Sequence, residues 1–247
     1  MNFSMRKVSA VMWAKSRALT DKNMILGPVM ILGLTVGMRF LYQSMRNGEP
    51  LTPTLLSMVL NLGLNMNITM TGMFGTSAAL AEEKEKFTLR ALMTSSVSSL
   101  EFFVGSILPP FLEIMAVNVA LIPVSGVSMA MINVPLYLLV TAIASVTSCI
   151  IGMIIGIFAK NQMSASTLTS PAMLVFMLIP TFGNFTPFLE KLSGFLFTGV
   201  VAKMVSSYAA GDAFSLGILN TAVLFGEIVL AVMIFAACYR KNGYEAD

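Results

Sequence analysis

Long apolar segments dominate this chain and limit the folds available to it. Six such segments can be traced along the 247 residues, of which 56% are hydrophobic and only 11% are charged. Soluble domains carry about 25% charged residues, whereas a membrane-crossing helix needs about 20 mostly apolar residues. The sequence therefore predicts an all-α polytopic membrane protein that forms a single transmembrane domain over residues 1–247.

The predicted spans are recognised by their length and their lack of charge. They cover Met24–Tyr42, Thr54–Leu80, Phe102–Val124, Val134–Ala159, Ser164–Gly183 and Leu216–Tyr239. Pro171 and Pro180 are expected to break the fifth span, because proline removes a helical hydrogen bond. Residues 184–215 are apolar but interrupted by charges, so they are predicted to form an external re-entrant or interfacial helical hairpin before the last span.

The first 22 residues mix basic and apolar side chains. This pattern predicts an interfacial helix, with its apolar side in the membrane and its basic groups toward anionic head groups. The apolar run that follows has no cleavage pattern close behind it, so it is expected to be an uncleaved first span.

The distribution of basic residues predicts the orientation of the spans. With the N-terminus inside, eleven lysines and arginines face the cytoplasm and only four face the other side. Both termini and the connection between spans two and three are therefore expected to be cytoplasmic.

Several classes of function are excluded or disfavoured by what the sequence lacks. It contains no histidine, which removes the usual metal ligand and the general base of most intramembrane hydrolases. It also contains no Gly-Lys dipeptide, so the phosphate-binding loop that ends in this pair is missing. Cys149 and Cys238 suggest neither a disulfide nor a metal pair. We predict no metal, no cofactor and no ATP hydrolysis on this chain.

A charged island, Glu82–Lys86, interrupts the apolar pattern between spans two and three. It must lie outside the hydrocarbon layer. The stretch behind it is amphipathic, with apolar residues spaced on one helical face from Leu89 to Leu100, and Thr88 can cap its start. The pattern alone leaves two interpretations open, a lever against a partner protein or a helix that lies along the membrane.

Residues 83–101, EKEKFTLRALMTSSVSSLE, resemble the signature of ABC-2-type transporter permeases. In that family an acidic-basic run leads into a Thr-Leu pair, a Leu-Leu-like pair, a turn and a glutamate that opens the third span. The matching positions here are Thr88-Leu89, Leu92-Met93, Ser95, Val97-Ser98 and Glu101. The sequence departs from the family at Phe87, Ser96 and Ser106, where the family usually has Gly, Pro and Lys.

The resemblance implies the membrane-spanning half of an ABC exporter in the cytoplasmic membrane of a bacterium. A second permease subunit, identical or paralogous, would complete the pore, and a separate ABC ATPase would dock beneath each subunit. Residues 81–101 would then form the coupling segment. Its candidate residues are Glu82, Glu83, Glu85, Thr88, Leu89, Arg90, Leu92 and Met93.

Polar residues inside the predicted spans are candidates for a translocation path. Asn61, Asn65 and Thr69 recur every four residues and share one face of span two. Glu113 and Glu227 lie near the centres of spans three and six, where a carboxylate costs roughly 2.5–3.5 kcal/mol to insert. For the stripe, substrate contact and interhelical hydrogen bonding both remain open. For the two glutamates, polar packing is favoured over proton coupling.

Small residues form a second stripe, in span four, at Ala144, Ser148, Gly152 and Gly156; Gly33 and Gly37 repeat this spacing in span one. Such faces allow helices to approach closely, and we expect them to pack within one subunit.

The sequence thus predicts a permease subunit of an ATP-driven exporter, with a lipophilic or amphipathic peptide or drug as cargo. Two alternatives remain, an ATP-independent carrier that uses Glu113 and Glu227 as proton sites, and a membrane immunity protein that sequesters a peptide. An integral membrane enzyme is the least supported class, for want of histidine and of any nucleophile–base grouping.

Overall fold

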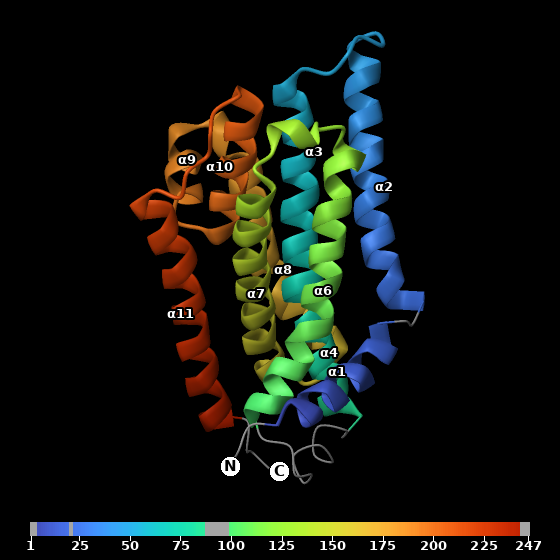
Figure 1. Cartoon of the computed structure of the whole chain (residues 1–247). Coiled ribbons are helices and arrows are strands. Elements are labelled where there is room, and N and C mark those ends of the chain that lie inside the picture. Colours follow the sequence, from blue (N-terminus) through green and yellow to red (C-terminus); the bar gives the residue numbers. More distant parts are fainter. Residues whose placement is uncertain (1–3, 20–21, 87–98, 243–247) are drawn as a thin grey trace.

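The computed structural model describes residues 4–19, 22–86 and 99–242, and every regular element in these ranges is a helix (Figure 1). Five of these helices are long and apolar enough to cross a membrane. They are α2 (Lys22–Met45), α6 (Ser99–Ser125), α7 (Val134–Phe158), α8 (Gln162–Thr181) and α11 (Ile218–Asn242). The prediction of an all-α protein is therefore confirmed for the described residues, and five of its helices have the length and apolar character of membrane spans.

The predicted second span is a helical column built from three pieces. It consists of α3 (Pro53–Met66), η1 (Asn67–Gly75) and α4 (Thr76–Glu85), which follow one another without a break. The column begins with Thr52, whose hydroxyl accepts the N–H of Leu55, and with proline at the first helical position. Its middle piece, η1, is a π-helix, which no pattern in the sequence predicts.

The helix α1 (Met5–Leu19) lies across one end of the bundle, beside α4 and the start of α6 (Figure 1). Its buried residues Val8 and Val11 pack over Gly105 of α6, where a methyl group would meet Val11 at 2.8 Å. We call this end of the bundle the α1 end, and the end that carries the α2–α3 connection the opposite end.

The small residues of α7 pack against the column, as predicted. A methyl group on Gly152 would lie 2.1 Å from Thr76 Oγ1 and 2.3 Å from the carbonyl oxygen of Met73. The contact is closer than any side chain permits, so glycine is required there. By contrast, a methyl group on Gly33 or Gly37 would meet nothing within 4 Å among the described residues. The prediction of packing within the chain holds for α7 and not for α2.

The helix α8 runs through Pro171 and Pro180 without a break, so the prediction that these prolines interrupt it was wrong. Membrane-type helices tolerate proline where hydroxyl side chains and neighbouring helices supply the lost hydrogen bonds. In α8, Thr169 pairs with Ser77 of α4 at 2.8 Å, which holds the helix against α4 close to Pro171 without replacing the bond that the proline lacks.

Residues 184–215 contain two short helices, α9 (Pro187–Ser193) and α10 (Phe197–Ala210), at the opposite end of the bundle (Figure 1). The helix α10 packs along α3 and α8, and most of its residues are buried. It ends at Gly211, whose φ of 78° is a left-handed conformation that favours glycine.

Candidate functional site

The last turn of α4 is hydrogen-bonded to the turn that joins α7 to α8. Nζ of Lys84 donates to the carbonyl of Ile157 at 2.6 Å and to that of Ala159 at 2.9 Å. The Glu85 carboxylate accepts the N–H of Gln162, the first residue of α8, at 3.3 Å. Because a helix carries partial negative charge at its end and partial positive charge at its start, each side chain meets a helix terminus of opposite sign.

The helix α1 is fastened to the same region through Lys15. Its ammonium group contacts the Glu83 carboxylate and lies 5.1 Å from the ring centre of Phe102 in α6. Burial lowers the pKa of Lys15 to about 8, although the neighbouring Glu82 carboxylate acts to raise it. The charge of Lys15 is therefore lost as pH rises through 8, and its attraction to Glu83 is lost with it.

Glu101, at the start of α6, adds a further tie to α1. Its side chain is 1% exposed, and it accepts the backbone N–H of Ser4 at 2.7 Å. The ammonium group of Lys7 lies 4.0 Å from the same carboxylate. We use the name charged joint for the group formed by Lys15, Glu83, Lys84, Glu85 and Glu101, which connects α1, α4, α6, α7 and α8.

The structure gives the predicted coupling residues different surroundings. Glu83, expected to contact an ATPase, is in contact with Lys15 of its own chain. Glu82 pairs with Lys86 one turn later, and both side chains are well exposed, at 43% and 66%. Glu85 is also exposed. The remaining candidates lie outside the described residues; they are Thr88, Leu89, Arg90, Leu92 and Met93.

The predicted polar stripe is buried inside the bundle. Asn61, Asn65 and Thr69 are at most 8% exposed. The amide of Asn65 donates to Asn61 Oδ1 at 3.0 Å, and the Thr69 hydroxyl donates to the carbonyl of Asn65 at 2.6 Å. The stripe is thus bonded along its own column. Asn65 Oδ1 has no hydrogen-bond partner among the described residues.

A second polar network crosses between helices, and the sequence interpretation did not assign it. Asn67 Nδ2 donates to Asn118 Oδ1 at 2.8 Å and to the carbonyl of Ile114 at 3.0 Å, both in α6. Asn67 Oδ1 accepts the Thr71 hydroxyl, and Tyr137 of α7 donates to the carbonyl of Asn118 at 2.7 Å. The available signal was Asn67, next to the stripe in the second apolar segment, and the single Asn118 in the third, since asparagines within apolar segments often bond across helices.

The two intramembrane glutamates have unlike environments. Glu227 of α11 accepts the N–H of Phe197, the first residue of α10, at 2.7 Å. Its carboxylate therefore caps a helix start, where partial positive charge favours an anion. Glu113 is partly exposed on α6, and no hydrogen bond or ion pair of its side chain is found in the described ranges. The structure does not bring these two residues into one hydrogen-bonded site.

Replacing Glu227 by leucine is expected to lower stability by about 1–2 kcal/mol, because the Phe197 N–H would lose its acceptor. Glutamine keeps an acceptor oxygen, so Glu227→Gln is expected to retain most of the stability. Thermal unfolding of the purified variants in detergent measures the difference. Glu113→Gln is the matched control and should leave the unfolding temperature unchanged. Equal losses for Glu227→Gln and Glu227→Leu would show that capping is not its role.

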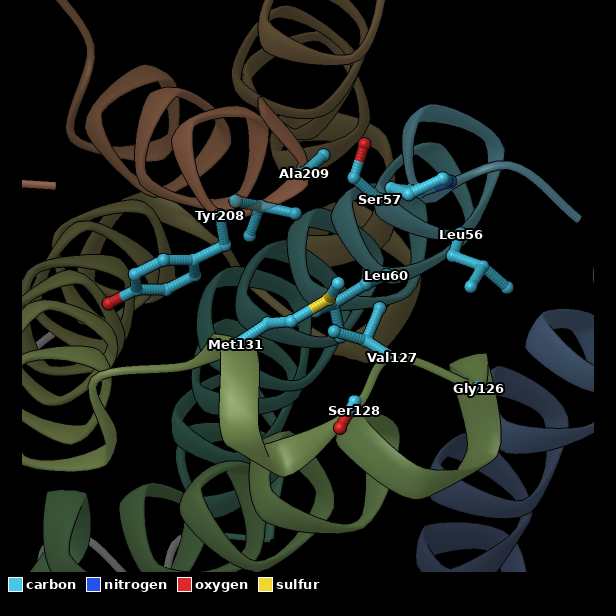
Figure 2. A pocket seen from close by; sticks show the side chains of 11 residues that line it. Leu56, Ser57, Leu60, Gly126, Val127, Ser128, Met131, Tyr208 and Ala209 are labelled. Carbon is cyan, nitrogen blue, oxygen red and sulfur yellow. The ribbon is translucent and has the colours of Figure 1, made fainter. Parts of the chain in front are cut away.

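An apolar pocket with a volume of about 140 Å³ opens at the opposite end of the bundle (Figure 2). It lies between the start of α3, the α6–α7 connection and the end of α10. Leu60, Val127 and Met131 form much of its wall, and Tyr208 stands at one side. The Tyr208 hydroxyl donates to the carbonyl of Asn133 at 3.4 Å. The volume is that of a cavity that holds a single apolar ring.

No protein-family model matches this chain, and no curated protein matches it. The functional interpretation therefore depends on the geometry of the bundle and on the resemblance carried by residues 83–101.

Proposed function

We propose that this chain is the membrane-spanning permease subunit of an ATP-driven exporter, with its ATPase on a separate polypeptide. The observation that supports this most directly is the charged joint. A partner that moved the end of α4 would move α1, α7 and α8 with it, because Lys15, Lys84 and Glu85 connect them. Force applied at one surface would thus reach most of the bundle.

In this proposal the chain crosses the membrane six times. The column α3–η1–α4, which is second along the chain, adds one crossing to the five single helices. Its pieces of 14, 9 and 10 residues give about 50 Å of helix, which is longer than the hydrocarbon core of about 30 Å. The helix α1 lies in the interface, and the exposed side chains of Met5 and Trp13 suit contact with lipid. The short pair α9–α10 forms the re-entrant segment, supported by the burial of α10 along α3.

The ATPase would bind at the α1 end, which the distribution of lysine and arginine assigns to the cytoplasm. Glu82, Glu85 and Lys86 are the exposed charges of α4 there and are the proposed ionic contacts. A second permease subunit, identical or paralogous, completes the pore. The cargo is a lipophilic or amphipathic peptide or drug, of which the apolar pocket at the opposite end has room for one ring-sized group.

The proposal predicts an ATPase that co-purifies with the tagged full-length chain from its native membrane. Photolabelling with azido-ATP should mark this second polypeptide and leave the chain itself unlabelled. Inverted vesicles should take up a dansyl-labelled amphipathic peptide when ATP is added. Uptake should stop with orthovanadate and continue with a protonophore. Labelling of the chain itself, or uptake that follows the proton gradient alone, would contradict the proposal.

The binding surface is tested by the charge swap Glu82→Lys with Lys86→Glu. The swap keeps a pair of opposite charges one turn apart and the net charge of the chain, yet reverses the pattern that a partner meets. We expect co-purified ATPase activity to fall on the order of tenfold. Glu49→Lys, at the opposite end, is the control and should have no effect.

A further inference from the structure

The π-helix η1 occupies nine residues in the middle of the α3–η1–α4 column. Each of its turns closes one residue later than an α-helical turn, so it holds more residues than an α-helix of the same number of turns. π-Helices are rare, usually a single turn long, and frequent at functional sites. A nine-residue example at the centre of a buried column is therefore an unusual feature that needs an explanation.

Side chains from two neighbouring helices support η1. Ser148 of α7 donates to the carbonyl of Ile68 at 2.5 Å, and Thr76 donates to the carbonyl of Cys149 at 3.0 Å. Asn67 is bonded to Asn118 of α6. These hydrogen bonds are specific to the π-helical conformation. If the same residues became α-helical, the bonds would break and other partners would be needed.

Other polar groups are poorly satisfied in this conformation. Asn65 Oδ1 and Asn118 Nδ2 are buried and have no hydrogen-bond partner within the described part of the chain. An unpaired buried polar atom costs free energy. The hydrogen bonds of Ser148, Thr76 and Asn67 stabilise the π-helical conformation, whereas the unpaired atoms destabilise it. The free-energy difference between the π-helical conformation and an α-helical register of η1 is therefore smaller than the hydrogen bonds alone would give.

The two ends of the column are held differently. The charged joint fixes α4 to α1, α7 and α8. For α3, no side-chain hydrogen bond to another helix is found among the described residues; it is held by packing against α2, α6, α8 and α10, as where Gly63 meets Leu121 and Thr35. We therefore expect a change inside η1 to turn α3 against these packing contacts rather than to break the hydrogen bonds and ion pair that hold α4.

We propose that η1 is a register switch between π and α conformations. When one π turn becomes α-helical with the sequence unchanged, its extra residue lengthens the α-helix, so one flank rotates by about 100° and shifts by about 1.5 Å relative to the other. With α4 fixed, this rotation carries Asn61 and Asn65 to a new set of neighbouring helices. The link to transport rests on the proposed function, but the switch itself belongs to the isolated chain.

The test measures distances between spin labels in the purified full-length protein, without ATP or any partner. In a background with both cysteines replaced by alanine, labels are placed at Thr54→Cys on α3 and Leu139→Cys on α7, two exposed positions. Deleting Met70 from η1 removes a surplus residue, so the column becomes more α-helical without turning its flanks. The label pair Leu112→Cys and Leu139→Cys, on α6 and α7, is the control.

The proposal predicts two distance populations for the α3–α7 pair, separated by several ångströms and at most about the 10 Å diameter of a helix. The Met70 deletion should leave one population, and the control pair should show one population throughout. A single population in the unmodified column, or two that survive the deletion, would overturn the switch. Neither result depends on whether an ATPase partner exists.

If the deletion prevents folding, Thr76→Val provides the second variant. It keeps the shape of the side chain and removes the hydroxyl, which bonds to the carbonyls of Gly72 in η1 and of Cys149 in α7. The minor population should then grow at least severalfold. An unchanged ratio of the two populations would count against the proposal.

Discussion

Replacing Gly152 by leucine is expected to prevent stable folding of this protein. Even a methyl group there would lie 2.1 Å from Thr76 Oγ1 and 2.3 Å from the carbonyl of Met73. A backbone carbonyl cannot move aside as a flexible side chain can, so α7 would have to separate from the column. We expect a loss of about 3 kcal/mol or more. Survival of the monodisperse peak in size-exclusion chromatography after heating measures it.

The matched control is Gly33→Leu. It introduces the same side chain in α2, where a methyl group meets nothing within 4 Å in the described chain. This variant should unfold at the temperature of the unmodified protein. If Gly152→Leu and Gly33→Leu behaved alike, the close packing of α7 against η1 and α4 would be wrong.

Reversing the charge of Lys84 is the second large effect that we expect. Lys84→Glu would place a carboxylate against the carbonyls of Ile157 and Ala159, at the negative end of α7. Two charge-assisted hydrogen bonds are lost and replaced by repulsion. Because Lys84 is only partly buried, we expect a loss of about 2 kcal/mol. Thermal unfolding of the purified variant reports this loss.

Lys86→Glu serves as the comparison for Lys84→Glu. Lys86 makes an ion pair with Glu82 within its own helix, and its side chain is 66% exposed. Exposed pairs of this kind contribute only about 0.3–0.5 kcal/mol, so the unfolding temperature should hardly change. Similar losses at residues 84 and 86 would show that the contact with α7 does not hold the end of α4.

The sequence is sufficient to predict the helices and part of their packing. Apolar length alone located α2, α6, α7, α8 and α11, and the spacing of Ser148, Gly152 and Gly156 predicted a close helix contact within the chain. These features follow from local sequence pattern and from the thickness of the bilayer, which sets the length of each span.

Features that depend on which helices become neighbours could not be predicted from the sequence. The charges of Glu83 and Glu85 suggested a partner protein, because their actual partners lie 68 and 77 residues away in the chain. The prolines of α8 suggested a break, because the packing of α8 against α3, η1, α4 and α10 could not be foreseen. The π-helix has no signature of its own, since its conformation is set by contacts with α6 and α7.

The joint at the end of α4 also constrains how the protein is made. During translation Lys84 emerges well before the carbonyls of Ile157 and Ala159 exist, and Glu85 emerges before the N–H of Gln162. The end of α4 therefore waits in the nascent chain until the following two long helices have been synthesised. A ribosome-bound fragment that stops short of residue 157 would lack the partners of both Lys84 and Glu85, and its helices would still be free to rearrange in the membrane.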